Sequence, residues 1–332
     1  MTFKYNNIYI NSTSTIAGPL EMKGPLSEKY DKGYKDFYFG SKTWEQAESK
    51  ILTESVELTL AKLKKEKQDI DVHISGDLLN QLVSTNYSSA KLGIPLIGVY
   101  AACATSMLSM IIGSNMIESK QIKNCIISTS SHNNGSEKQF RQPVEYGGPK
   151  KKTTTFTVTG AASAYLSSEE GRLKVESATL GRVIDMGIKD SSHMGAVMAP
   201  AAADTIYKHL KDMNRSIEYY DLILTGDLGI YGKKILKEYM KTEYDIELKH
   251  YDDTACMIYN LGQQKVYAGG SGPACMPLVV YSYIFDRMKK GELNKVLLVA
   301  TGSLHSQTVV NQKLSIPAIA HAVSVEVCHD LS

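Results

Sequence analysis

The sequence lacks long hydrophobic runs and contains few cysteines. No stretch reaches about 18 uninterrupted apolar residues, the length that a membrane-spanning helix needs, so we expect no such helix. The five cysteines are odd in number and form no Cys-x-x-Cys pair, which argues against a secreted disulfide framework and against a structural zinc site. Residues 1–12 do not have the charged-then-apolar order of a signal peptide. We therefore expect folding in a cytoplasm-like compartment, with any membrane attachment made through a partner.

Clustered basic charge is also scarce. The net charge of the 332 residues is +2, and the short lysine runs at 64–67 and 150–152 read as solvated surface, so we expect no nucleic-acid partner. With 43% hydrophobic and 22% charged residues, the composition is that of a soluble globular protein. The length suits two halves, which we place at residues 1–170, including an N-terminal arm, and at residues 171–332.

An internal repeat supports the division into two halves. Residues 74–78 read ISGDL and residues 224–228 read LTGDL. Cys103 and Cys275 lie 172 residues apart, and each opens an uncharged stretch that leads into a similar apolar strand. The repeat predicts two copies of one half-fold, with the two uncharged helices side by side between two sheets.

Hydrophobic periodicity predicts short strands alternating with helices, which is typical of a mostly parallel sheet covered by helices. We expect a helix over Thr43–Lys67 and a second helix at residues 104–117 that is buried on all sides, because it carries no charge. The first 45 residues are polar and rich in Gly and Pro, so they predict an irregular arm with one strand at Ile8–Asn11. Residues 135–152 predict a polar loop.

The segment around Cys103 resembles the nucleophile position of the thiolase superfamily, where a cysteine begins the central helix of the first half. Residues 101–107 read AACATSM. The resemblance implies an α/β protein with the thiolase-like five-layer α/β/α/β/α sandwich, made of two pseudo-symmetric halves. It also implies a homodimer paired through the strand before the cysteine, at residues 94–100.

A closer resemblance links most of the chain to the stage V sporulation protein AD family. The motifs that carry it are Ala17–Pro19, Gly76–Gln81, Ser130–Asn133, Gln139–Arg141, Glu145–Gly148, Met198–Thr205, Tyr220–Leu228, Ala268–Gly272 and Ile316–His321. This resemblance implies a dipicolinic acid binding protein, with or without calcium, that supports uptake of the acid into the developing spore. It implies membrane-embedded stage V sporulation channel proteins as partners, and a location in the forespore or spore at the inner membrane. No cofactor and no protein-bound metal are expected.

The position of Cys103 before a helix suits two kinds of chemistry. The free N–H groups and the positive end of the helix dipole favour a thiolate, and they favour a bound carboxylate equally well. Thr105 or Ser106 is expected to cap the free N–H groups. The third reading is a cysteine that only fills core space.

Acyl transfer by a thiolase relative also needs a base and an oxyanion hole. In the related initiating ketoacyl synthases the base histidine falls at the position of the Thr225–Asp227 turn, and the asparagine falls at the position of Gly269–Gly272. Neither residue type is present at these positions, and an aspartate of ordinary pKa is a weak base that repels a thiolate. We therefore predict a non-catalytic binding protein, with an acyl-transferring enzyme that uses Cys103 as the alternative.

The predicted ligand-binding residues stand at strand ends and in the glycine loop before the second central helix: Cys103, Asp77, His132, Asp227, Gly226, Gly270 and His321. The two histidines either bind ligand carboxylates or are satisfied core residues. The two aspartates either contact ligand or calcium, or cap the turns that follow them. The glycines permit close approach of the backbone to a ligand.

Overall fold

The structure is a computed structural model that describes residues 1–140 and 150–328. Its main feature is a 12-stranded sheet in which two runs of five strands are joined. The first run has the order β5 (Leu96–Gly98), β4 (Val72–Gly76), β6 (Asn124–Ser131), β8 (Gly160–Ser167) and β2 (Tyr9–Ala17). The second run has the order β11 (Tyr251–Asp253), β10 (Leu222–Thr225), β13 (Lys295–Ser303), β14 (Ala318–Val327) and β9 (Leu173–Thr179). Two short strands extend it, and two more form a separate pair: β1 (Thr2–Lys4) on β9, β3 (Lys32–Gly33) on β2, and β7 (Phe156–Thr157) with β12 (Gly270–Ser271).

The two runs repeat each other in strand direction as well as in order. In the first, β4 is parallel to β5 and β6, whereas β8 is antiparallel to β6 and β2. The second run shows the same pattern around β10 and β14. The runs meet through one residue pair, Tyr9 with Lys174. The repeat confirms the prediction of two pseudo-symmetric halves.

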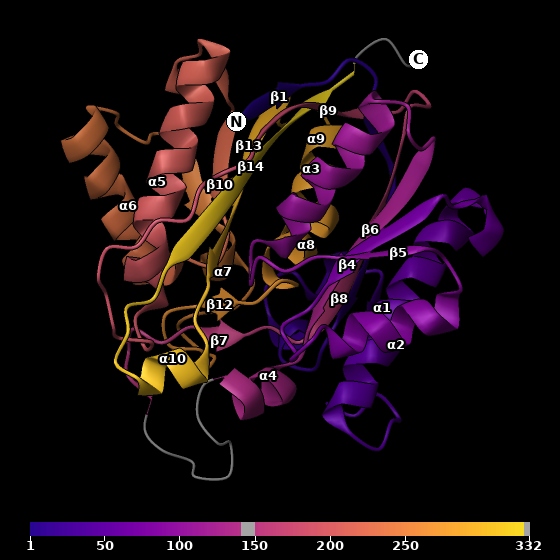
Figure 1. Cartoon of the computed structure of the whole chain (residues 1–332), viewed down its shortest axis with the longest axis horizontal. Helices are drawn as coiled ribbons and strands as arrows, with labels where there is room; N and C mark the ends of the chain where they lie inside the picture. The colour runs from indigo at the N-terminus through magenta and orange to yellow at the C-terminus, as the bar shows by residue number, and fades with distance from the viewer. Residues whose placement is uncertain (141–149, 329–332) are drawn as a thin grey trace.

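The helices complete the five layers (Figure 1). α1 (Trp44–Leu63) and α2 (Val83–Leu92) cover the outer face of the first half, and α5 (Met194–Met213) and α6 (Gly229–Tyr244) cover that of the second. Between the two five-strand runs of the sheet lie two helices. One is α3 (Thr105–Glu118), and the other is the continuous helix formed by α8 (Cys275–Val279), the π-helical turn η6 (Val280–Ile284) and α9 (Phe285–Lys289). The shorter helices are α4 (Asn133–Phe140), α7 (Thr254–Met257) and α10 (Gln307–Asn311).

The N-terminal segment is only in part the irregular arm that its composition predicts, because the strand predicted at Ile8–Asn11 is present but longer, as the nine-residue β2 of the main sheet. Ser14 of β2 is fully buried, and its hydroxyl donates to the carbonyl of Ser55 in α1 at 2.5 Å. The Ser14 hydroxyl also accepts a hydrogen bond of 2.8 Å from Thr59. The prediction was partly wrong because serine and threonine, which suggest a loop by composition, here satisfy one another between a strand and a helix.

Two other predictions change in detail. The helix predicted over Thr43–Lys67 is confirmed as α1, which begins after Thr43 and ends where Lys64 takes a left-handed conformation. The Thr43 hydroxyl caps it by accepting from the amide of Gln46 at 3.2 Å. The polar loop predicted at residues 135–152 instead starts within the helix α4; residues 141–149 lie outside the described part of the chain.

The prediction that residues 104–117 are buried on all sides is wrong on one face. Leu108, Ile112 and Met116 are partly exposed and form a stripe along α3 at a spacing of four residues. At the equivalent positions of the second central helix, 172 residues later, Val280, Ile284 and Met288 are fully buried. The segment that contains Leu26 and Tyr30 belongs to the same core cluster as the second helix, and Lys29 of this segment pairs with Asp286 of the helix at 3.0 Å.

Candidate functional site

Cys103 lies in a tight turn immediately before α3. The preceding residue, Ala102, has a φ of 49°, in the left-handed region that non-glycine residues rarely adopt. The Thr105 hydroxyl holds the turn, because it accepts from the amide of Ala101 at 3.1 Å and donates to the carbonyl of Ala102 at 2.6 Å. Neither Thr105 nor Ser106 caps the helix as predicted; Ala104 is the N-cap residue and its side chain makes no cap. The thiol is therefore held at the helix N-terminus by a strained backbone turn.

Asp227 connects the two halves at this point. It is 1% exposed, and its Oδ2 accepts a hydrogen bond of 2.7 Å from the amide of Gly272. The thiols of Cys103 and Cys275 both contact the same carboxyl group. The two repeat-related cysteines thus meet at one aspartate, which stands where ketoacyl synthases have their base.

Burial raises the pKa of Asp227 to about 8, although the two thiols favour the ionised form. Asp253, also buried, raises the pKa of Asp227 further by its negative charge. The prediction assumed an aspartate of ordinary pKa, and the structure changes that premise. Burial thus favours the protonated form of the Asp227 carboxyl group.

A small cavity opens beside Cys103. Its volume is about 30 Å³, which is the share of one water molecule in the liquid. The lining residues come from both halves: Leu78, Tyr100, Ala102, Cys103, Ser136, Thr157, Met194, Ser271, Gly272, Ser303 and His305. The hydroxyls of Ser136 and Ser303 are buried and have no hydrogen-bond partner in the described part of the chain. Buried hydroxyls without partners are costly, so the cavity is suited to a polar ligand that would satisfy them.

Cys103 is the one predicted residue in this lining. Asp227 lies directly behind it, since its partners Cys103 and Gly272 reach the cavity. Gly226 packs against Met276, to which an added Cβ would approach within 3.2 Å. Gly270 packs against Ile258 and Cys275, at 2.7 and 3.1 Å by the same measure. Both glycines therefore make close approaches to protein atoms in the core.

Asp77 caps its own turn. Its two carboxyl oxygens accept from the amides of Leu79 and Thr85, each at 2.8 Å, and the side chain is fully buried. Burial raises the pKa of Asp77. The structure therefore places this aspartate in the capping role that was the alternative to ligand or calcium contact.

His132 and His321 lie away from the cavity lining. His132 donates from Nε2 to the carbonyl of Phe37 at 2.7 Å and lies among the rings of Phe37, Phe39 and Trp44. His321, in β14, accepts from the amide of Gly181 at 3.2 Å. Burial lowers the pKa of each histidine to about 4, so both are neutral at physiological pH.

The residues that sequence reasoning missed include the hydroxyls of Ser136 and Ser303 and the imidazole of His305. Ser303 ends β13, and His305 follows two residues later at the cavity. The sequence contains one hint, because the strand ends in Thr-Gly-Ser-Leu-His, and polar residues after a buried strand commonly reach a site at the sheet edge. Ser136 lies in α4, where a loop was predicted.

The described residues show neither a metal centre nor a membrane span. No group of three or more His, Cys, Asp or Glu side chains in residues 1–140 and 150–328 is placed to hold a metal ion. Among the helices described, none has the length and apolar character needed to cross a bilayer.

Solved structures define the class of protein. The fold is similar to OleA of Xanthomonas campestris with cerulenin bound, with a TM-score of 0.63 and 14% identity over 98% of both chains. It is also similar to 3-oxoacyl-[acyl-carrier-protein] synthase III of Aquifex aeolicus, with a TM-score of 0.54 and 12% identity over 96% of this chain and 99% of that one. The chain therefore has the thiolase-like fold of the condensing enzymes.

The family is defined by sequence. The model of the stage V sporulation protein AD family matches residues 1–326. Stage V sporulation protein AD of Bacillus subtilis is 46% identical over 320 residues, which cover 96% of this chain and 94% of the relative. The chain belongs to the stage V sporulation protein AD family, as its motifs predict, and is thus a sporulation protein.

Proposed function

We propose that the protein binds dipicolinic acid at the Cys103 cavity, without chemistry, and supports uptake of the acid into the developing spore. The identity of the ligand rests on the family resemblance. The absence of catalysis rests on one observation, that Asp227 and the glycine loop Gly269–Gly272 stand where the ketoacyl synthases have their histidine and asparagine.

The lining favours the calcium chelate over the free acid. It contains hydroxyls, an imidazole and backbone groups, but no lysine or arginine among the residues that the structure describes. An uncompensated dianion in such a site would be costly, whereas calcium neutralises the carboxylates and leaves oxygen atoms that accept hydrogen bonds. Ser136 and Ser303 would donate to these oxygens.

Binding requires the cavity to widen. Its volume of about 30 Å³ is several times smaller than a pyridine ring with two carboxylates. Met194 and His305 are lining side chains that do not belong to the main sheet, and a methionine changes rotamer readily. We propose that these two side chains move when the ligand enters.

Titration calorimetry tests the binding proposal. Wild-type protein should release or absorb heat with dipicolinate, with higher affinity when equimolar calcium is present. Cys103→Ala should weaken binding, and the matched control Cys256→Ala, a half-buried cysteine outside the lining, should not. No heat with wild-type protein, or equal affinity in Cys103→Ala, would refute the proposal.

The alternative is acyl transfer through Cys103, favoured by the position of the thiol before α3. Incubation with acyl-CoA and intact mass measurement distinguishes the two functions. The binding proposal predicts no adduct, whereas a thioester adduct that disappears in Cys103→Ala would establish the enzyme.

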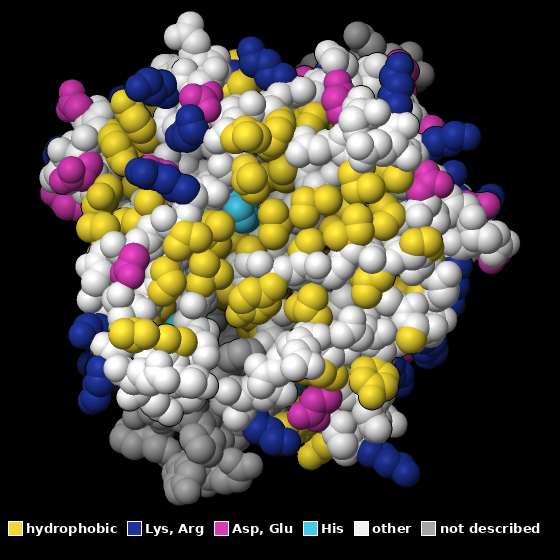
Figure 2. Space-filling view, in the orientation of Figure 1, with side chains coloured by type: hydrophobic (Ala, Val, Ile, Leu, Met, Phe, Trp, Pro, Cys, Tyr) yellow, Lys and Arg dark blue, Asp and Glu magenta, His cyan; other side chains and the backbone are white. Residues whose placement is uncertain are grey.

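We further propose that the protein is a homodimer. β5 is an edge strand of the sheet, and next to it in sequence α3 exposes the apolar stripe of Leu108, Ile112 and Met116. Figure 2 shows hydrophobic side chains gathered across the centre of the face on which α3 lies. A second copy would cover this stripe. Light scattering should give the mass of two chains at micromolar protein, and a monomer would contradict this.

The remaining proposals follow the family resemblance: a place in the spore, attached peripherally to its inner membrane by membrane-embedded stage V sporulation channel proteins. Fractionation of sporulating cells tests both. The protein should sediment with spore membranes when these channel proteins are present and stay in the supernatant when they are deleted.

A further inference from the structure

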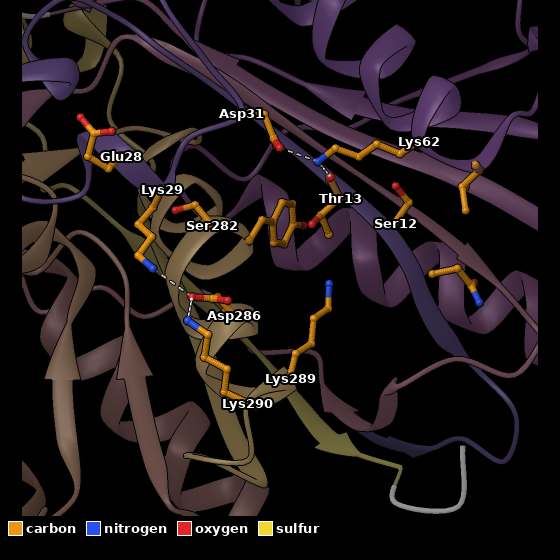
Figure 3. A pocket seen from close by; sticks show the side chains of 13 residues that line it. Ser12, Thr13, Glu28, Lys29, Asp31, Lys62, Ser282, Asp286, Lys289 and Lys290 are labelled. Atoms are coloured by element: carbon orange, nitrogen blue, oxygen red, sulfur yellow. Dashed lines mark hydrogen bonds and ion pairs between the residues drawn. The ribbon is translucent and has the colours of Figure 1, made fainter. Parts of the chain in front are cut away.

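A larger groove lies at the far end of the second central helix from the Cys103 site. Its volume is about 470 Å³, in the range of ligand-binding clefts. Lys289 ends the helix that Cys275 begins, so at a rise of about 1.5 Å per residue the two sites are about 20 Å apart. The groove is lined from both halves by Asn11, Ser12, Thr13, Glu28, Lys29, Asp31, Lys62, Leu63, Tyr281, Ser282, Asp286, Lys289 and Lys290 (Figure 3).

The acidic residues of the groove already hold three of its lysines. Asp286 accepts from Lys29 at 3.0 Å and from Lys290 at 2.9 Å. Asp31 accepts from Lys62 at 2.6 Å. These contacts hold the three ammonium groups on the walls, and two of them share one carboxylate.

Lys289 is different. Figure 3 shows its side chain extending into the groove between the two walls, and no hydrogen bond or ion pair of its ammonium group occurs within the described residues. The Lys289 side chain is solvent-exposed in this open groove. Partial desolvation and the positive charges of Lys62 and Arg172 lower its pKa, against the attraction of Asp286 and Asp31. An anion in the groove would relieve this repulsion.

The helix end explains part of this arrangement, because cations are favoured at a helix C-terminus. It does not explain why Lys62 and Thr13 approach from the other half. Lysine ammonium groups and hydroxyls suit a tetrahedral phosphate, whereas a planar carboxylate is matched by the fork of an arginine, and the described lining contains no arginine.

We infer that this groove binds a phosphate group at Lys289, with Lys62 and Lys290 adding positive charge on the walls, either as free phosphate or as the headgroup of an anionic lipid. The inference does not depend on the function proposed for the Cys103 cavity.

Titration of the full chain with inorganic phosphate at low ionic strength tests the inference, since salt screens the groove. Wild-type protein should bind at millimolar phosphate or below, and Lys289→Gln should weaken binding about tenfold or more, as expected for loss of a charge-assisted hydrogen bond. Lys237→Gln, an exposed lysine on α6, is the matched control and should not change affinity. Glu28→Gln removes a negative charge from the groove and should strengthen binding, which misfolding would not do.

Vesicles distinguish the two sources. The ligand is a lipid headgroup if phosphatidylglycerol vesicles bind wild-type protein but not Lys289→Gln, and if inorganic phosphate displaces the wild-type protein from the vesicles. If phosphate binds in solution but these vesicles do not, the ligand is a free phosphate. No phosphate binding by wild-type protein, equal binding by Lys289→Gln, or tighter binding of dipicolinate than of phosphate at this groove would overturn the inference.

Discussion

The two halves of the molecule carry the same Gly-Asp-Leu turn at the end of equivalent strands, yet the two aspartates have different partners. Asp77 accepts two backbone amides of its own turn and the following helix. In the second half this capping role belongs to Asp253, which accepts from the amides of Leu228 and Gly229 at 3.2 and 3.0 Å. Asp227 adopts a φ of 68° and contacts Gly272 and Cys103 instead.

The difference shows how two copies of one half-fold can form a single site, the cavity beside Cys103. Because Asp253 caps the turn in the second half, Asp227 does not need to, and its carboxyl group can contact residues of the first half. The central helices also differ, because Ile284 of the second is fully buried and the equivalent Ile112 of the first is partly exposed. Equivalent positions of the two halves therefore provide matched pairs for mutagenesis.

The largest difference is expected between the central helices. Ile284→Glu places a charge in a site that is 0% exposed, which should cost more than about 4 kcal/mol and unfold the protein. Ile112→Glu, at the equivalent position of α3, should leave a folded monomer because only the dimer contact is lost. Circular dichroism and light scattering measure the two outcomes. A dimer of Ile112→Glu, or equal unfolding of both variants, would remove the distinction between the helices.

The two aspartates come next. Asp77→Ala leaves two buried backbone amides without hydrogen-bond acceptors and should lower the free energy of unfolding by about 2–5 kcal/mol. Asp227→Asn puts a neutral amide of the same shape in place of a carboxyl group whose protonated form burial favours, so at pH 7 it should not lower the free energy of unfolding and should raise it. Urea denaturation compares them. If Asp227→Asn were the more damaging change, the assignment of roles would be reversed.

A pH series sharpens this comparison. The folded pKa of Asp227, about 8, lies above its value of 3.8 in an unfolded chain, so the folded state binds the extra proton. The contribution of Asp227 to the free energy of unfolding of the wild type is fully present below pH 3.8. It is lost as the pH rises towards 8, by about 1.4 kcal/mol per pH unit. Asp227→Asn lacks this loss, so it should gain stability relative to wild type across that range. A gap that stays constant with pH would show that Asp227 titrates normally.

The smallest effect is expected at the cysteines. Cys103→Ala should weaken dipicolinate binding about tenfold, which is about 1.4 kcal/mol. Cys275→Ala, at the equivalent but fully buried position, should change stability while leaving affinity within about twofold. Calorimetry at equal protein concentration checks both. Equal losses of affinity would mean that the second cysteine also shapes the cavity.

The sequence predicts the fold better than the candidate site. The repeat, the uncharged central helices and the family motifs predict the two halves, and two of the predicted site residues, Cys103 and Asp227, lie in contact in the structure. The sequence does not predict that Asp253 replaces Asp227 as the cap, because this depends on the left-handed backbone at Asp227 and on the strand pairing of β10 with β11. Nor does it predict Ser303 and His305, since common polar residues after a strand acquire meaning only from what lies opposite them.

A crystal structure of the protein with calcium dipicolinate tests the central claim most directly. The account predicts density for an intact ligand beside Cys103, with Ser136 and Ser303 donating to its oxygens and with Met194 and His305 displaced. Density at the Lys289 groove alone, an empty Cys103 cavity, or a covalent adduct on the thiol would contradict it.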